Sequence, residues 1–186
     1  AEKSFGDGSL LLEKYFEKAK HIEFQIVGDH HGTYLHLFDR ECSMQRRYQK
    51  VIEESPSPSL TPELRALMGK ASVAIAREVK YTNVGTVEFI LDEEKNFYFL
   101  EVNTRLQVEH GVTEMVVGVD LVQMQLATAM GEELQMEQEE ITQFGNSIEC
   151  RVCAEIPEKN FMPATGEIAF VSPPYASLMR IDSGIE

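Results

Sequence analysis

Apolar and polar residues alternate with a period of two along residues 21–41, HIEFQIVGDHHGTYLHLFDRE. Ile22, Phe24 and Ile26 fall on one face of an extended chain, and the alternation resumes after the GDHHG segment. Because successive side chains of a β-strand point to opposite faces, this pattern predicts two half-buried strands. We expect a hairpin with its turn at residues 28–32.

Helical spacing follows the proline-rich segment SPSPSLTP, residues 55–62. Thr61 is a suitable N-cap, and Pro62 suits the first helical position. Apolar residues then recur at intervals of three and four residues as far as about Lys80, namely Leu64, Leu67, Met68, Ala71, Ile75 and Val79. The pattern predicts an amphipathic helix whose apolar stripe packs on the sheet.

A second hairpin is predicted at residues 84–102, VGTVEFILDEEKNFYFLEV. If its loop is the four residues 93–96, a common hairpin length, Asp92 pairs with Phe97 and Glu88 lies opposite Glu101. From Glu101 onward every second residue is charged or an amide, through Asn103, Arg105, Gln107 and Glu109. The intervening apolar residues, Leu100, Val102, Leu106 and Val108, face the other way.

Two interpretations of this polar face remain open. It can be the solvated outer face of an amphipathic strand. Alternatively, two opposed acids destabilise a hairpin unless a cation lies between them, and Mg²⁺ prefers oxygen ligands of this kind. The register is an assumption, and a shift of one residue would remove the pairing of Glu88 with Glu101.

The remaining pattern contains one more helix and some short strands. Asp120 can cap the helix LVQMQLATAM, and Gly131 ends it. Strand-like segments lie around residues 148–154 and 166–171, with proline-marked turns. Helices and mostly antiparallel strands are segregated along the chain, which indicates the α+β class.

Composition narrows the possible partners. The chain has 186 residues, 43% hydrophobic and 26% charged, with a formal net charge of -14. This charge repels nucleic acids and acidic membrane surfaces, so neither is expected as a partner. Within this acidic chain, cations concentrate between residues 40 and 50, near Gln45 and Gln49; they are Arg40, Arg46, Arg47 and Lys50. A bound anion would therefore be held locally.

The cysteines give no evidence for a metal or a disulfide. There are three, an odd number, and Cys150 and Cys153 form a C-x-x-C without a second cysteine or histidine pair. Residues three apart on a strand point to opposite faces. We expect chemically inert thiols.

Four segments together resemble a known family. The segments ECSMQRRYQKVIEESPSP, GTVEFI, FYFLEVNTRLQVEHGVTE and IECRVCAE are similar, in order and spacing, to signature segments of the biotin carboxylase component of biotin-dependent carboxylases, which are ATP-grasp proteins. The resemblance covers essentially the whole chain. It implies the C-terminal half of an ATP-grasp fold at residues 1–131 and the start of the biotin carboxylase C-terminal domain at residues 132–186.

The resemblance also implies roles for individual residues. Mg²⁺, or Mn²⁺, would be bound by Glu88, Glu101 and Asn103. Bicarbonate would be held by Lys50, Arg105, Gln107 and the backbone of Val108. Glu109 would be the general base, and Arg151 would stabilise the enolate-like form of biotin. ATP would contact Glu13, Lys14 and Phe16 at its adenine, and His21 and Gln45 at its ribose.

The implied reaction converts bicarbonate and MgATP to carboxyphosphate and then carboxylates biotin. The implied partners are a biotin carboxyl carrier domain and a carboxyltransferase component, and a homo-oligomer is plausible. The expected location is cytoplasmic, or the mitochondrial matrix in a eukaryote. Another ATP-grasp ligase, such as a carbamoyl-phosphate synthetase, and a non-catalytic cation-binding module are the alternatives. The final carboxyl acceptor stays open.

This sequence departs from the family pattern at several places. Tyr48 stands where His is common, and Gly111 stands where Pro is common, which frees the backbone after Glu109. The glycine-rich loop and phosphate-binding lysines of the family's lid do not occur in these residues. We therefore expect the 186-residue segment to be a fragment that is inactive alone.

Overall fold

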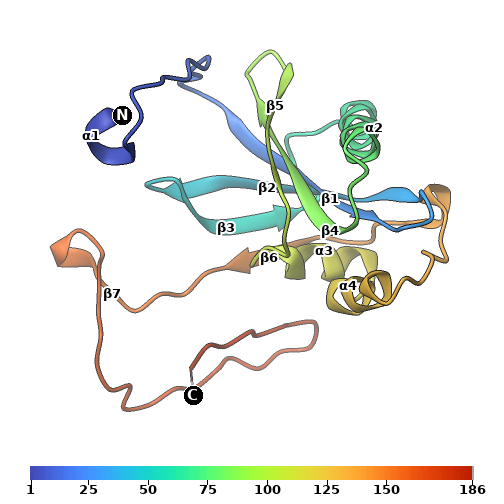
Figure 1. The fold of residues 1–186 in the computed structure, drawn as a ribbon. Coiled ribbons are helices and arrows are strands. Elements are labelled where there is room, and N and C mark those ends of the chain that lie inside the picture. Colours follow the sequence, from blue (N-terminus) through green and yellow to red (C-terminus); the bar gives the residue numbers. More distant parts are fainter. Residues whose placement is uncertain (186) are drawn as a thin grey trace.

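The computed structural model describes residues 1–185, whose centre is a six-stranded sheet with the order β5-β4-β1-β2-β3-β6 (Figure 1). All neighbouring strands are antiparallel. The strands are β1 (Lys20–Gly28), β2 (Tyr34–Arg46), β3 (Gln49–Ser55), β4 (Asn83–Leu91), β5 (Phe97–Asn103) and β6 (Ser147–Cys150). The predicted α+β class is confirmed.

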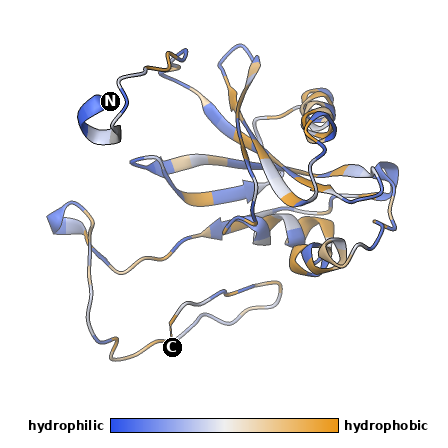
Figure 2. Ribbon diagram, viewed as in Figure 1, coloured by the Kyte–Doolittle hydropathy of each residue, from blue (hydrophilic) through white to orange (hydrophobic). Residues whose placement is uncertain are grey.

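The first predicted hairpin is confirmed, with Gly28 paired to Tyr34. Its second strand continues to Arg46 and turns back into β3 through Arg47 and Tyr48, which have φ angles of 52° and 65°. Positive φ at both central residues is the requirement of the tightest hairpin turns. Of the cationic segment, Arg46, Arg47 and Lys50 therefore lie at the tip of a hairpin, seen as a hydrophilic stretch in Figure 2, whereas Arg40 is buried further back in β2.

The helix α2 (Pro62–Glu78) begins as predicted, because the Thr61 hydroxyl accepts a hydrogen bond of 3.3 Å from the backbone N–H of Leu64. The predicted apolar stripe is partly wrong. Leu67 and Val79 are 56% and 60% exposed. The buried line of the helix instead runs through Met68, Gly69, Ser72 and Ala76. Small residues on this line let the helix approach the sheet closely.

The two faces of the sheet have separate cores. Ile22, Phe24 and Ile26 of β1 pack with Met68 of α2 on one face. On the other face Val27 packs with Leu35, Leu37, Val84 and two residues of α4 (Leu121–Ala129), Leu121 and Met124. Figure 1 shows α2 and α4 on opposite sides of the sheet. Along β1, the face that carries Val27 continues with the polar residues Gln25, Glu23 and His21, which therefore lie beyond the α4 core.

The second hairpin forms with a different register near its turn. Leu91, rather than Asp92, pairs with Phe97, so the predicted loop is wrong by one residue. An irregularity between Glu88 and Phe89 shifts the ladder by one residue, and Glu88 still pairs with Glu101. A β-bulge places two residues of one strand against one of the other, which accounts for the recovered pairing.

The predicted polar face does not continue as a strand. β5 ends at Asn103, residues 104–109 form a loop, and the helix α3 (His110–Val117), which the sequence analysis did not anticipate, follows directly. The helix α4 is confirmed at both ends. The Asp120 carboxylate accepts a hydrogen bond of 2.8 Å from the N–H of Gln123, and Gly131 follows the last turn with a φ of 84°.

The chain ends run away from the sheet in Figure 1. They contain α1 (Glu2–Phe5), η2 (Pro157–Lys159) and the small pair β7 (Glu155–Ile156) and β8 (Met162–Pro163), whereas η1 (Gln138–Glu140) precedes β6 and is hydrogen-bonded to β2 between Gln138 and His36. β6 confirms the strand expected near residue 148, but residues 166–171 form no strand, so that expectation is wrong. Ile168 and Phe170 there are 52% and 82% exposed, and no strand pairs with them in the described part of the chain.

Two further points concern organisation. β6, from beyond residue 131, pairs with β3 in the main sheet, and the proposed division at residues 131 and 132 stays a prediction. Within residues 1–185, no helix has the length and apolar character required to cross a membrane.

Candidate active site

Four ionisable residues form a row across neighbouring strands. Glu101 of β5 pairs with Glu88 of β4, Glu88 pairs with Glu23 of β1, and Glu23 pairs with Arg40 of β2. Cross-strand partners share a face and lie about 5 Å apart at Cβ, so three carboxylates and one guanidinium are brought together. The pairing of Glu88 with Glu101 was predicted from the sequence, and the other two were not.

Lys50 bridges the acids of this row. Its Nζ donates to Glu23 Oε2 at 2.5 Å, to Glu88 Oε1 at 2.8 Å and to Glu109 Oε1 at 2.6 Å. Burial lowers the pKa of Lys50, but the surrounding negative charges, that of Glu23 foremost, outweigh burial and raise the pKa above its ordinary value. Lys50 therefore remains charged, and it offsets the repulsion between neighbouring carboxylates.

Arg40, the cation at the end of the row, has no exposed surface. Its Nε donates to Glu23 Oε1 at 2.5 Å, and its other nitrogens donate to Gln25, Thr86, Gln107 and Thr113. Burial raises the pKa of the Glu23 carboxyl, but Arg40, His21 and Lys50 together hold it well below its usual range. The buried guanidinium is thus paired and hydrogen-bonded, as a buried charge must be.

The sequence analysis did not assign a role to Glu23 or connect it with Arg40. A signal was available, since the alternation of HIEFQIV already placed Glu23 and Gln25 opposite the apolar face of that strand. An acid and an amide on the second face of a largely buried strand require polar partners.

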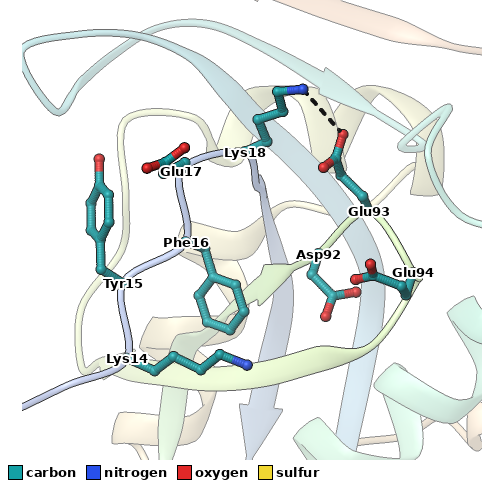
Figure 3. A pocket seen from close by; sticks show the side chains of 8 residues that line it. All are labelled: Lys14, Tyr15, Phe16, Glu17, Lys18, Asp92, Glu93 and Glu94. Atoms are coloured by element: carbon teal, nitrogen blue, oxygen red, sulfur yellow. Dashed lines mark ion pairs between the residues drawn. The ribbon is translucent and has the colours of Figure 1, made fainter.

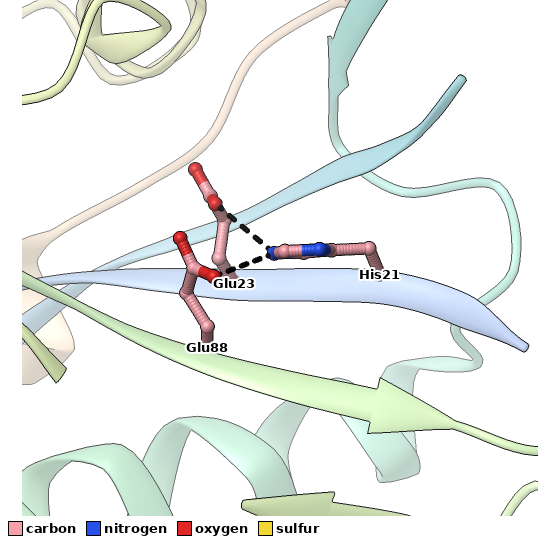
Figure 4. A group of neighbouring side chains, drawn as sticks. All are labelled: His21, Glu23 and Glu88. Atoms are coloured by element: carbon pink, nitrogen blue, oxygen red, sulfur yellow. Dashed lines mark ion pairs between the residues drawn. The ribbon is translucent and has the colours of Figure 1, made fainter. Parts of the chain in front are cut away.

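The predicted metal ligands converge. The Asn103 Nδ2 donates to Glu88 Oε1 at 3.0 Å and to Glu101 Oε1 at 3.1 Å. His21 Nε2 lies 3.0 Å from Glu88 Oε2 and 3.6 Å from Glu23 Oε2 (Figure 4). Burial lowers the pKa of His21, but the two neighbouring carboxylates, Glu23 and Glu88, outweigh burial and raise it to about 9. The carboxylates can therefore surround a small bound cation. Without such a cation, the protonated ring of His21 supplies the positive charge beside them.

Glu109 is held between two cations. It precedes α3 as the N-cap residue, and its side chain is 3% exposed. Lys50 contacts one carboxylate oxygen, and Arg151 Nη2 donates to the other at 2.7 Å. Gln107, from the same loop, donates to Glu88 Oε1 at 2.8 Å. Although β5 has ended, the loop therefore places the two predicted residues Gln107 and Glu109 in contact with the row.

Arg105 contacts none of the carboxylates directly. It is exposed, and its guanidinium donates to its neighbour Leu106 at 3.2 Å and to Asn103 Oδ1 at 3.4 Å. The sequence-based placement of Arg105 on one continuous strand face is therefore wrong, because β5 ends two residues earlier.

The residues expected to contact nucleotide lie beside this acidic row, and His21 contacts both groups. Gln45 Nε2 and His21 Nδ1 are 3.1 Å apart. The Phe16 ring lies 4.8 Å from that of Tyr98, and Lys14 Nζ lies 4.6 Å from the Phe16 ring centre. A smaller cavity of about 380 Å³ separates this segment from the turn at residues 92–94, where Lys18 lies 3.8 Å from Glu93 (Figure 3).

One cavity of about 840 Å³ connects these groups. Every residue to which the resemblance assigned a role lines it: Glu13, Lys14, Phe16, His21, Gln45, Lys50, Glu88, Glu101, Asn103, Arg105, Gln107, Val108, Glu109 and Arg151. Tyr48 lines it too, with 94% of its surface exposed. The cavity is large enough for a ligand of nucleotide size.

The cysteines are unpaired. Cys150 and Cys153 are exposed, whereas Cys42 is buried beside Glu23 and Glu109, and burial raises the pKa of its thiol well above the usual value. The expectation that the C-x-x-C binds no metal stays a prediction.

Comparison with known proteins identifies the family. Residues 1–137 match the family model described as the carbamoyl-phosphate synthase L chain, ATP binding domain. The chain belongs to this family. Two relatives of this ATP-binding domain are the mitochondrial methylcrotonoyl-CoA carboxylase subunit alpha of Mus musculus and the chloroplastic biotin carboxylase 2 of Populus trichocarpa, each 51% identical over all of this chain. The chain spans 26% of the first relative's length and 35% of the second.

Solved structures agree with the ATP-binding-domain assignment. The biotin carboxylase β-γ-ATP complex from Campylobacter jejuni superimposes with a TM-score of 0.88 at 44% identity, covering 94% of this chain and 39% of that one. The biotin carboxylase domain of Hydrogenobacter thermophilus 2-oxoglutarate carboxylase, in complex with MgADP, ADP and bicarbonate, gives 0.86 at 52% identity with the same coverage. The resemblance to biotin carboxylases is thereby confirmed. Because relatives are named as mitochondrial and chloroplastic, a cytoplasmic location does not follow for this chain.

Proposed function

We propose that this chain supplies metal-, bicarbonate- and biotin-binding groups to an ATP-dependent biotin carboxylase. The observation that carries the proposal is the single cavity that all the assigned residues line. The reaction would convert bicarbonate and ATP to carboxyphosphate and then transfer the carboxyl group to N1′ of biotin on a carrier domain. A carboxyltransferase component would use the product.

Glu88, Glu101 and Asn103 would hold Mg²⁺ or Mn²⁺. Their side chains meet within hydrogen-bond distance, and the Asn103 amide can turn its oxygen toward a cation, so all three offer oxygen ligands. The bound cation would supply positive charge to the phosphates of ATP.

Glu109 would accept the proton of bicarbonate. Its carboxylate is fixed by Lys50 on one oxygen and by Arg151 on the other. Bicarbonate binding beside Lys50 and Gln107, with the backbone of Val108, would place an anion between the base and the cations. Arg105, exposed at the cavity wall, would close on the same anion from outside.

Arg151 would then face the oxyanion that develops on the ureido oxygen of biotin. Glu13, Lys14 and Phe16 would contact adenine, with His21 and Gln45 at the ribose. The family name also includes carbamoyl-phosphate synthases, but the relatives at about half identity are carboxylases, which favours biotin as the acceptor.

Calorimetry with this chain tests the proposed metal binding. We expect Mg²⁺ to bind more tightly when a non-hydrolysable ATP analogue is present, because the phosphates supply further ligands. Glu101→Gln should weaken this metal binding by about tenfold or more. Glu94→Gln, which removes an exposed acid from the same hairpin's turn, is the matched control and should bind like the wild type.

Turnover tests the remainder in the complete protein that contains this segment. We expect bicarbonate-dependent ATP cleavage that biotin stimulates, and Glu109→Gln should abolish most of it. Cleavage that requires bicarbonate and ammonia but ignores biotin would instead assign the site to carbamoyl-phosphate synthesis.

A further inference from the structure

β3 contacts both the backbone and the side chain of Arg151. Its backbone N–H donates to the carbonyl of Val51 at 3.0 Å, and its Nη2 lies 2.8 Å from Glu53 Oε1. Glu53 has no exposed surface and is two residues further along the same strand. The strand thus fixes the position of the guanidinium, as well as the path of the chain that carries it.

The same guanidinium nitrogen has two acidic partners with different surroundings. Glu109, at 2.7 Å, lines the cavity, whereas Glu53 does not. A base that turns toward bicarbonate withdraws from Arg151. Glu53 would then be the remaining acid in contact with the guanidinium, and it cannot reach the substrate itself.

Glu149 moderates this second contact. It lies directly opposite Glu53 in the pairing of β3 with β6. Burial, followed by the charge of Glu53, raises the pKa of Glu149 to about 7, and burial also raises the pKa of Glu53. Two neighbouring carboxyls that disfavour joint ionisation carry less than two full charges near neutral pH. The pair therefore places less negative charge beside Arg151 than two ionised carboxylates would.

We propose that Glu53 is a positioning residue for Arg151: it keeps the guanidinium directed at the cavity while Glu109 is engaged with bicarbonate. The inference rests on the proposed function and extends it, because it assigns a task to a residue that touches no substrate. The affected step is the carboxylation of biotin, where Arg151 would act, and not the cleavage of ATP that precedes it.

A double-mutant cycle in the complete protein tests the inference. Two rates are measured for the wild type, Glu53→Gln, Arg151→Ala and the double variant: carboxylation of free biotin, and bicarbonate-dependent ATP cleavage without biotin. Misplacement of a reacting group by even 1 Å can cost on the order of 100-fold, so we expect Glu53→Gln to slow biotin carboxylation by about tenfold. ATP cleavage should change less than about twofold, because Lys50 still holds the other oxygen of the base Glu109.

In the Arg151→Ala background, the same Glu53→Gln change should have no further effect on biotin carboxylation, since residues that act through one another are not additive. Glu54→Gln is the matched control, because Glu54 lies on the same strand with its side chain on the opposite face. If Glu53→Gln does not fold, Glu53→Asp serves in the cycle, since it keeps the charge and shortens the reach.

The possible failures are distinguishable. Additive losses in the cycle, equal losses in both rates, or an equal loss for Glu54→Gln would overturn the role of Glu53 while leaving the carboxylase assignment intact. A wild-type protein whose ATP cleavage ignores bicarbonate and biotin would overturn the proposed function itself.

Discussion

At the scale of single residues, burial has opposite consequences for ionisable groups with and without an oppositely charged partner. Arg40 has no exposed surface, yet Glu23 and several hydrogen-bond acceptors surround it. His36 is also buried, but the rings of Phe24 and Phe38 lie edge-on to it at 5.7 and 5.5 Å. Arg40 therefore keeps its charge, whereas His36 is stable only when neutral.

The protonation of His36 predicts a pH dependence of stability. Burial lowers its pKa from 6.5 to about 4. As pH falls through this window, the unfolded state takes up a proton that the folded state refuses, so stability is lost. We expect His36 to lower the free energy of unfolding by roughly 3 kcal/mol between pH 7 and pH 4.

Urea denaturation of the wild type and His36→Met across this range measures the effect, and the variant should show a flatter profile by that amount. His30→Gln, at an exposed position in the first turn, controls for loss of a histidine and should keep the wild-type slope. Parallel profiles for the wild type and His36→Met would contradict the assignment.

At the scale of elements, the two helices α2 and α3 differ in how closely a glycine on each approaches neighbouring atoms. A Cβ placed on Gly69 of α2 would lie 2.5 Å from Nε2 of His36 on β2. A Cβ placed on Gly111 of α3 would meet nothing closer than 3.6 Å. Both glycines are buried in helices, but only α2 needs the missing side chain for its packing.

The two glycines therefore predict opposite results for the same substitution. Gly69→Ala should destabilise the protein by about 1–3 kcal/mol, because overpacking displaces the His36 ring or the helix. Gly111→Ala should be neutral or stabilise by up to about 1 kcal/mol, because alanine favours a helix and has room. Thermal and urea denaturation compare them; equal effects would show that α2 does not depend on this contact.

At the scale of the whole molecule, burial is concentrated in the centre of the sheet. All but the first two residues of β1 are buried, whereas residues 157–185 are almost entirely exposed. Local stability follows buried contacts and protected hydrogen bonds. The central strands and the C-terminal segment should therefore open with very different free energies.

Native-state hydrogen exchange measures this difference. We expect the amides of β1 and β4 to exchange slowest, and those of residues 157–185 to exchange at rates near those of an unfolded chain. Slow exchange throughout the C-terminal segment would contradict this expectation and would indicate an association that covers it.

The sequence by itself determined the local features of this protein. The two hairpins, the caps at Thr61 and Asp120, and the end at Gly131 follow from short-range backbone preferences, which neighbouring residues express. The sequence also predicted the pairing of Glu88 with Glu101, but from a loop that differs by one residue, and the bulge beside Glu88 restores the pairing. The family resemblance named the residues of the cavity before their positions were known.

Only the tertiary structure decided how distant residues meet. The loop that returns Glu109 to the row and the contacts of Lys50 with three acids depend on strands and loops far apart in the chain. A period-two pattern tells which residues share a face but not which strand lies beside them. The partners of Glu23 and Glu53 therefore became visible only in the folded sheet, where β1 and β3 each lie between two other strands.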